Sequence, residues 1–394
     1  MNTLHKNSNL FIIAVIAIVN ALGYGIIIPI LYTYSHRYGL NDFQNGLLFA
    51  IFSACQFIAT PIIGRLSDKY GRKPLLVVSL TGTVLSFLLM AIAPNAIYLF
   101  IARAIDGITA GNIPVALAVI SDTTEPKDRT KGFGIIGASF GFGFVFGPSI
   151  SALTFGIGSA LPFLIAAGIA LLAVLLTVIL LPETNTHRGL PYHEKLFDFV
   201  HMAKALFDEN IGLTLLISLL YSFGFTLFIY AYQPLSVEVL HLTATQISVN
   251  FTLFGLVGLI AQAVIIPFMT RKFGEKPMLT NALLFSIFTF ISFYFTRSLM
   301  MLIVVSMVHA LVNGFVNPLV QSLLSKEVDA HSQGSIMGLN ASYVSIGMIL
   351  GPVVGGLLAT IIIPLPFLLG AVIVAVCFYL SLLILRKHRA ALSV

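Results

Sequence analysis

The stretch GRLSDKYGRKP, Gly64–Pro74, concentrates charge in a chain that otherwise carries little of it. Only 9% of the 394 residues are charged, whereas soluble domains carry about 25%. Apolar runs flank the stretch on both sides, and a shorter relative of it, RKFGEKP, occupies Arg271–Pro277. We therefore interpret both segments as short polar loops between long apolar elements, and the second loop indicates an internal repeat.

The composition around these loops is typical of a membrane protein. Hydrophobic residues make up 58% of the chain and the mean hydropathy is +1.00, which leaves too few charges to coat a soluble globule of this size. The net charge of +6 does not indicate a nucleic-acid partner, because bases in short loops orient a membrane protein in its bilayer. Cys55 and Cys377 lie in apolar runs and are interpreted as small buried side chains. The sequence contains no GxxxxGK[ST], HExxH or CxxC motif, so we expect no enzyme, no ATP-driven pump, no metal and no cofactor.

The apolar runs are long enough to cross a bilayer, which needs about 20 residues per crossing. The first, Leu10–Leu31, is followed by no small-residue cleavage site, so we expect an uncleaved first helix. Backbone groups in lipid must pair within their own segment, which predicts helices throughout. The predicted spans are twelve in number: 9–34, 44–64, 74–94, 96–121, 131–155, 160–181, 211–235, 244–269, 277–296, 298–324, 333–361 and 364–385.

The basic residues predict the orientation of these spans. With both termini in the cytoplasm, eighteen Lys and Arg residues fall on the cytoplasmic side and only Arg37 and Arg297 on the other. Arg103 falls within a span. This asymmetry is the positive-inside pattern, so we expect a multi-pass protein of a bacterial inner membrane with both termini inside.

The chain repeats itself after about half its length. Matching segments recur at an offset of 203 or 204 residues: YGRKPLL at Tyr70 with FGEKPML at Phe273, Gly147-Pro148 with Gly351-Pro352, and LPFL at Leu161 with LPFL at Leu365. We expect a six-helix half at 1–181, a cytoplasmic linker at 182–210 and a second six-helix half at 211–394. Parallel repeats of this kind occur in transporters that bind substrate between the halves near the middle of the membrane.

Several motifs, in order along the chain, resemble those of one transporter family. GRLSDKYGRK is similar to the loop 2–3 signature of the major facilitator superfamily. RAIDGITAG, Arg103–Gly111, and GFVFGPSIS, Gly143–Ser151, resemble its span-four and span-five signatures. LPET at Leu181 and LLSKEVDAHSQGSIMG resemble the end of span six and loop 10–11 of the tetracycline exporters. The resemblance covers nearly the whole chain and implies the twelve-helix drug:proton antiporter branch of that family.

The loop 2–3 motif is expected to act as a cytoplasmic gate. The resemblance assigns this role to Gly64, Asp68, Gly71, Arg72 and Lys73. Gly64 suits a close helix contact and Gly71 a tight turn. Asp68 could lie at the start of span eleven, near Ser332–Ser335, where a helix N-terminus favours an anion. The copy at Arg271–Pro277 lacks this Asp, so we expect only the first loop to latch.

The span-five motif predicts a close helix contact. Gly143 and Gly147 lie on one helix face, and Pro148 removes a backbone donor. A plain packing motif explains this pattern, while the resemblance implies a hinge and seal.

Two ionisable side chains lie deep inside span four. Asp106 and Arg103 are three residues apart and share a helix face. A charge at this depth costs about 2.5–3.5 kcal/mol on insertion scales and is a functional candidate. Either Asp106 carries a proton, tuned by Arg103 or by His309 in span ten, or Arg103 and Asp106 form a fixed ion pair.

Polar residues at similar depth predict a substrate cavity. In the family, spans one, four, seven and ten line that cavity. The candidate lining residues are Asn20, Tyr24, Asn112, Tyr221, Asn313 and Asn317. Singly, each is better explained by a hydrogen bond between helices. The chain offers Asn20 where the tetracycline exporters carry an acid in span one, and it has no acid in span nine, so Asp106 is the candidate replacement.

These features predict a monomeric secondary transporter that exports a small amphipathic or hydrophobic compound in exchange for protons. Its partners would be that compound, protons and the bilayer. The alternative on the same fold is an importer or facilitator of a nutrient, siderophore or metabolite. A membrane enzyme would place nucleophiles or metal ligands near an interface, and the sequence shows no such cluster.

Overall fold

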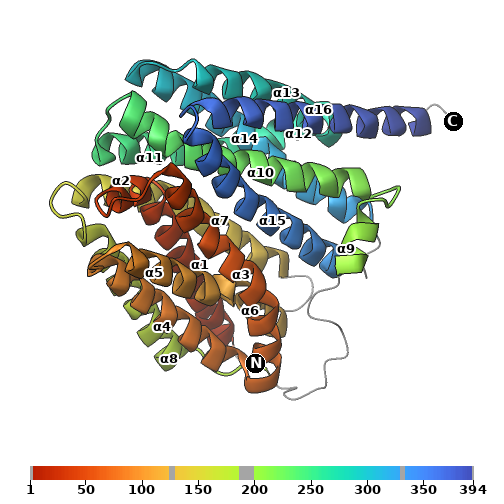
Figure 1. Ribbon diagram of the computed structural model, residues 1–394. Coiled ribbons are helices and arrows are strands. Elements are labelled where there is room, and N and C mark those ends of the chain that lie inside the picture. Colours follow the sequence, from red (N-terminus) through yellow and green to blue (C-terminus); the bar gives the residue numbers. More distant parts are fainter. Residues whose placement is uncertain (1–2, 124–128, 186–198, 329–332, 393–394) are drawn as a thin grey trace. The chain divides into compact units, whose positions relative to one another are not determined.

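A computed structural model describes residues 3–123, 129–185, 199–328 and 333–392 of the chain, and these residues form helices and connecting turns (Figure 1). The first six predicted spans correspond to these helices: α1 (Thr3–Ile27), α3 (Asp42–Tyr70), α4 (Arg72–Ala91), α5 (Ala96–Thr109) with α6 (Ile113–Thr123), α7 (Arg129–Thr154) and α8 (Leu161–Leu180). A short helix, α2 (Leu31–His36), follows the first span. The fourth span is therefore in two pieces, joined by a 3₁₀ turn at Ala110–Asn112.

The second half repeats the plan with different interruptions. A short helix, α9 (Phe199–Ala205), precedes α10 (Gly212–Pro234), α11 (Ala244–Ile260), α12 (Ile266–Phe273), α13 (Glu275–Tyr294), α14 (Leu299–Lys326), α15 (Gln333–Ala359) and α16 (Leu365–Leu392). A π-helical turn extends α10 over Leu235–Val239, and another joins α11 to α12 at Ala261–Ile265. Such turns interrupt the regular hydrogen-bond ladder.

Eleven segments in the described part of the chain are long and apolar enough to cross a membrane. The predicted span 131–155 coincides with α7, whose first side chains lie outside the described residues. The all-α, twelve-span prediction for a multi-pass membrane protein is confirmed.

The chain forms two compact units. The first comprises residues 1–40, 51–196 and 243–252, and the second comprises residues 41–50, 197–242 and 253–394. Each unit therefore includes a ten-residue segment from the other half of the sequence. The sequence-based division at 182–210 remains an interpretation of the repeat.

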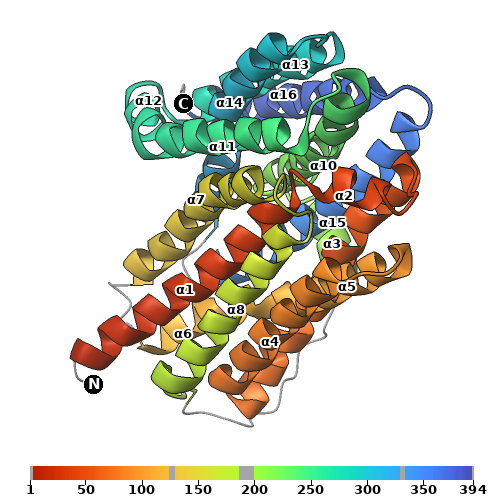
Figure 2. The ribbon, with the colours of Figure 1, turned by 90° about the vertical axis from the view of Figure 1, so that its left-hand side faces the viewer.

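Within the first unit, α1 and α7 lie side by side (Figure 2). A Cβ atom at Gly143 would lie 2.3 Å from the Cβ of Ala21, and one at Gly147 would lie 2.7 Å from the Cα of Gly25. Ser151 donates a hydrogen bond to the Ile26 carbonyl at 2.8 Å. Small residues allow this backbone contact, which is how helices associate in lipid.

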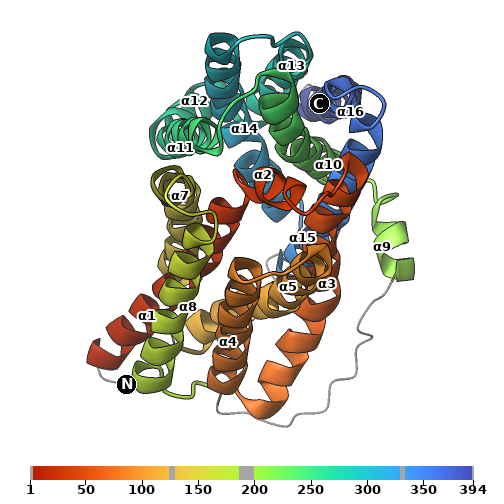
Figure 3. The same cartoon turned by 60° about the vertical axis from the view of Figure 1, so that its left-hand side comes forward.

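The second unit contains the repeat-related contact, between α10 and α15 (Figure 3). A Cβ atom at Gly347 would lie 2.6 Å from the backbone nitrogen of Phe223, and one at Gly351 would lie 2.7 Å from that of Leu227. Thr226 donates to the Gly347 carbonyl at 3.0 Å. The duplicated glycines therefore make the same kind of contact in both units.

Candidate functional site

Arg103 and Asp106 form an ion pair inside span four. Helix α5 begins after Asn95, whose side chain accepts from the amide of Ile97. Two turns further on, Arg103 Nη1 donates to Asp106 Oδ2 at 2.9 Å. The side chains are only 2% and 10% exposed. Water can screen neither charge effectively at this exposure, so each charge is stabilised mainly by the other.

The ion pair lies against an aromatic ring from α3. The Arg103 guanidinium stands 4.3 Å from the centroid of the Phe52 ring, a cation–π contact. Tyr24 from α1 packs against the same ring at 6.1 Å and is close enough to Arg103 for an electrostatic interaction. Arg103 Nε has no hydrogen-bond partner among the described residues. The first unit thus brings together Arg103, Asp106 and Tyr24, three of the residues singled out from the sequence.

Asn20 and Asn112 form a second polar pair in this unit. Asn20 Nδ2 donates to Asn112 Oδ1 at 3.0 Å and to the carbonyl of Ile16 at 2.9 Å. Asn112 is fully buried, and its own Nδ2 has no partner in the described part of the chain. This pair links spans one and four, as expected for interhelical hydrogen bonds, and leaves one buried donor free.

In the second unit, Tyr221 and Asn313 are partners. The Tyr221 hydroxyl donates to Asn313 Oδ1 at 2.7 Å, which joins α10 to α14. Asn317, one turn further along α14, is exposed. Asn317 is therefore not part of this pair, in which Tyr221 is buried and Asn313 is half-buried.

His309 is enclosed by phenylalanine rings. Its ring centroid lies 4.5 Å from Phe228, 5.2 Å from Phe290 and 5.6 Å from Phe293. Nδ1 is 2.8 Å from the hydroxyl of Thr289, and Nε2 has no partner among the described residues. The ring is fully buried. The sequence marked His309 as a polar group at depth and gave no sign of this aromatic enclosure.

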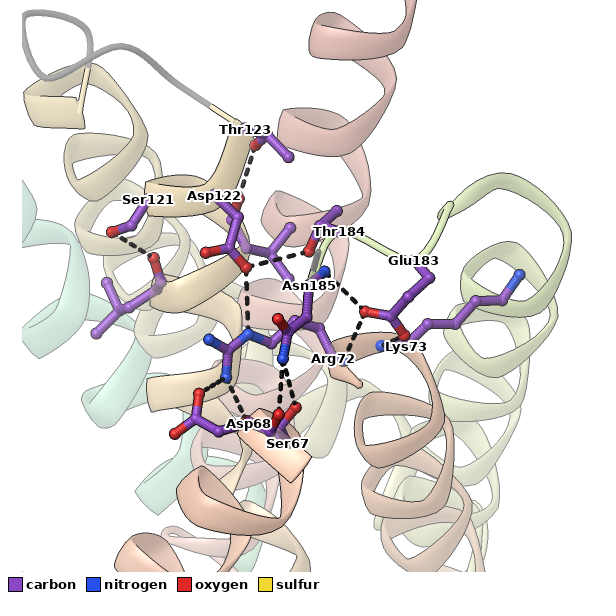
Figure 4. Close-up of polar contacts among 12 residues, drawn as sticks. Ser67, Asp68, Arg72, Lys73, Ser121, Asp122, Thr123, Glu183, Thr184 and Asn185 are labelled. Atoms are coloured by element: carbon purple, nitrogen blue, oxygen red, sulfur yellow. Dashed lines mark hydrogen bonds and ion pairs between the residues drawn. The ribbon is translucent and has the colours of Figure 1, made fainter. Parts of the chain in front are cut away.

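The loop 2–3 motif forms a charge cluster at the start of α4 (Figure 4). Arg72 Nη1 bonds to Asp68 Oδ1 at 2.5 Å and to the Ser67 hydroxyl at 2.7 Å. Arg72 Nε reaches Asp122 Oδ2 at the end of α6, at 3.2 Å. One guanidinium therefore ties the ends of three helices together.

Glu183 caps α4, a role that the sequence did not reveal. Its two carboxylate oxygens accept from the backbone amides of Arg72 at 2.9 Å and Lys73 at 3.2 Å. A carboxylate at a helix N-terminus satisfies unpaired amides and complements the helix dipole. Gly71, at φ +112°, has the conformation that a glycine permits, and a Cβ there would lie 2.3 Å from Glu183 Oε2. The LPET segment thus closes onto the loop 2–3 motif (Figure 4).

The described contacts of Asp68 and Gly64 differ from those expected of this motif. The side chains of Ser332–Ser335, the expected partner of Asp68, lie outside the described residues. The partner that is described for Asp68 is Arg72. A Cβ atom at Gly64 would have no described neighbour within 4 Å, so the expected close contact of Gly64 is not observed.

The second unit carries the repeat-related pair with the charges exchanged. Where Arg72 pairs with Asp122, Glu275 at the start of α13 pairs with Lys326 at the end of α14, at 2.8 Å. Glu275 also accepts from Ser322 at 2.8 Å. Both loops therefore form an ion pair between repeat-related positions, with the acidic and basic residues exchanged.

Glu327, beside this pair, accepts from the hydroxyl of Thr214 at 3.0 Å. Partial burial raises the pKa of its carboxyl above the ordinary value, while the Thr214 hydrogen bond and the charge of Lys276 act in the opposite direction.

A duplicated bundle of membrane helices, with one described ion pair and hydrogen-bonded amides inside its spans, is typical of a transporter. The family model described as Major Facilitator Superfamily matches residues 13–235 and 214–393. The chain belongs to the major facilitator superfamily, and is a transporter of small molecules across a bilayer and not an enzyme.

Relatives and solved structures agree with this assignment. Multidrug resistance protein 1 of Bacillus subtilis (strain 168) is 31% identical, over 96% of each chain. Tetracycline resistance protein, class H, of Pasteurella multocida is 29% identical over 88% of each chain. A bacterial homolog to the human lysosomal transporter Spinster matches with a TM-score of 0.79 at 16% identity, over 97% of each chain. The human organic anion transporter MFSD10 (TETRAN) matches with a TM-score of 0.73 at 20% identity, over 97% of this chain and 100% of that one. The two structures bear on the fold alone.

Proposed function

We propose that this transporter exports a small amphipathic or hydrophobic compound from the cell in exchange for protons, by alternating access. The names of its relatives support export, since they include multidrug, tetracycline and quinolone resistance proteins. We place it in the inner membrane as a monomer, with both termini in the cytoplasm, in line with the distribution of basic residues.

The buried Arg103–Asp106 pair is the observation that supports proton coupling. A carboxylate held at 2.9 Å from a guanidinium can lose that partner when a proton binds, because a neutral acid attracts the cation far less. The pair can therefore exist in two states of different charge distribution. Asp106 is the proton carrier in this proposal, and Arg103 positions it.

The proposed substrate-binding side chains are Asn20, Tyr24, Asn112, Tyr221, Asn313 and Asn317. They offer amide and hydroxyl groups beside aromatic rings, such as the contact of Tyr24 with Phe144 at 6.0 Å. That combination suits compounds with a planar apolar body and a few polar groups. His309 is proposed as a further proton-coupling side chain, held by the Thr289 hydroxyl at 2.8 Å from Nδ1 and by its aromatic enclosure.

Transport into inverted membrane vesicles tests the direction and the coupling together. Tetracycline and a quinolone are the first probes, and a wider set of cationic dyes extends them. Uptake that follows an imposed acidic interior supports export in exchange for protons. Uptake only into right-side-out vesicles would instead establish the importer or facilitator, the alternative on the same fold.

We also propose that the loop 2–3 motif, with Gly64, Asp68, Gly71, Arg72 and Lys73, acts as a cytoplasmic gate, and this role has a separate test. Asp68→Asn retains size and removes the charge that faces Arg72. We expect slower transport with binding of the probe intact, whereas equal loss of binding and transport would count against a gating role.

A further inference from the structure

Span four is broken one turn beyond Asp106. Helix α5 ends at Thr109, the 3₁₀ turn covers Ala110–Asn112, and α6 begins at Ile113. Pro114 lies just inside α6 and has no N–H with which to reach the Ala110 carbonyl four residues earlier. A 3₁₀ turn within a span frequently marks a hinge.

A side chain from α3 takes the place of the missing backbone donor. Gln56 Nε2 donates to the Ala110 carbonyl at 3.2 Å. Ala110 is 8% exposed, so this carbonyl has little access to donors from outside the protein. The 3₁₀ turn pairs the carbonyl with the amide three residues on, and the Gln56 amide is a second donor in place of the amide that Pro114 lacks.

Two glycines bring Gln56 within reach. A Cβ at Gly107 would lie 2.3 Å from the carbonyl oxygen of Phe52, and one at Gly111 would lie 3.2 Å from the backbone nitrogen of Thr60. Helix α3 therefore lies against the backbone of span four three residues before Ala110 and one residue after it. Gln56 lies between these two contacts on α3.

A second donor acts from α4. The Ser79 hydroxyl donates to the carbonyl of Thr109, the last residue of α5. The broken turn is thus held by side chains from two neighbouring spans.

The repeat provides an internal comparison. Pro318 is the counterpart of Pro114, and it lies within an uninterrupted α14. At the offset of 203 or 204, the counterparts of Gln56 are Leu259 and Ile260, which cannot donate. At Pro318, where no glutamine stands at the repeat-related position, the helix is continuous, and the break occurs where the proline and the glutamine are both present.

We propose that Gln56 is a positioning residue for transport: its amide replaces the donor missing at Pro114 and holds the broken turn of span four, which orients Asp106 and Asn112. Asp106 lies one helical turn before the 3₁₀ turn and Asn112 is its last residue, so the geometry of the turn sets the direction of each side chain relative to the other. This inference rests on the proposed proton-coupled transport.

A double-mutant cycle between Gln56 and Pro114 tests it. Gln56→Leu removes the donor at similar volume, and Pro114→Ala returns a backbone N–H to the chain. We expect Gln56→Leu to slow tetracycline-driven proton release from inverted vesicles at least fivefold and to change its pH profile. In the Pro114→Ala background the same substitution should change the rate less than twofold and leave the pH profile of that background unaltered. Gln321→Leu, at an exposed position of α14, is the matched control and should have no effect.

The thermal stability of the four purified proteins gives a second cycle that needs no substrate. A Gln56→Leu penalty that disappears in the Pro114→Ala background supports the inference, even if the single variant is too unstable for transport assays. Additive effects in both cycles, or full activity of Gln56→Leu, would overturn it. Additivity together with loss of proton coupling in Asp106→Asn rejects only the role of Gln56. Coupled effects on stability together with unchanged proton coupling in Asp106→Asn reject the proposed function instead.

Discussion

Replacing Asp106 with Asn separates the two roles open to the Arg103–Asp106 pair. At 2.9 Å, the attraction between the charges is about 6 kcal/mol for an effective dielectric constant of ~20. One charged side chain in mid-span costs about 2.5–3.5 kcal/mol, so two such charges cost roughly what their attraction contributes. The complete pair should therefore add little to the free energy of unfolding and take little from it.

The single variant leaves Arg103 charged and buried, with 2% exposure and no counter-ion. We expect the free energy of unfolding to fall by about 3 kcal/mol, at the lower end of the 3–5 kcal/mol typical of a broken buried pair. Arg103→Gln combined with Asp106→Asn removes both charges. This double variant should recover stability to within about 1 kcal/mol of the original protein.

The assay is unfolding of purified protein in detergent, alongside transport into inverted vesicles. If Asp106 carries the proton, the double variant folds normally but no longer responds to a pH gradient. A single-variant loss below about 1 kcal/mol would refute the premise that Arg103 is left as an unscreened buried cation. Normal proton-coupled transport by the double variant would refute the carrier role and leave a structural ion pair.

Three further outcomes follow from the contacts described. Gly147→Ala should reduce the free energy of unfolding by about 1–3 kcal/mol, because the added methyl group pushes α1 and α7 apart. Gly168→Ala is the control, since a Cβ atom there would have nothing within 4 Å, and it should have no such effect. Equal effects of the two substitutions would contradict the packing argument. Glu275→Lys should lower the melting temperature slightly, by the ~0.2–1 kcal/mol of an exposed pair, and the exchange Glu275→Lys with Lys326→Glu should restore it, unless the pair contributes nothing. Because the folded protein has a raised Glu327 pKa, its stability should decline as the pH rises through that pKa. In a pH series of melting curves, Glu327→Gln should therefore be more stable than the original protein at neutral pH. The two proteins should be equally stable at pH values below the ordinary pKa of a carboxyl group. A stability difference that does not change with pH would contradict this.

The helical architecture could be predicted because its signals are local or repeated. Twenty-residue apolar runs specify membrane helices whatever lies next to them. The recurrence of Gly147-Pro148 at Gly351-Pro352 pointed to equivalent helix contacts, and α1–α7 and α10–α15 supply them. The sequence placed Arg103 and Asp106 on one helix face because they are three residues apart, and the two side chains meet at 2.9 Å.

The features that escaped prediction depend on which spans become neighbours. Glu183 is 111 residues from Arg72, and nothing in LPET indicates that its carboxylate caps α4. The phenylalanines around His309 come from other helices, and in a chain with 32 Phe residues their positions carry no pairing signal. Gln56 and Pro114 are each ordinary alone, and their relation emerges only when α3 lies against the glycines of span four.

The bare contact between α1 and α7 has a consequence for how the protein is made. Gly143 leaves the ribosome more than a hundred residues after Gly25, which at ~5–20 residues per second is a delay on the order of ten seconds. During that time α1 is in the bilayer without its partner, and its glycine face meets lipid tails. Lipid must then be expelled completely when α7 inserts, since no space remains between the two backbones. Variants that enlarge this face should therefore reduce the yield of assembled protein at the stage of membrane insertion, and a molecule that holds nascent α1 would be expected to raise it.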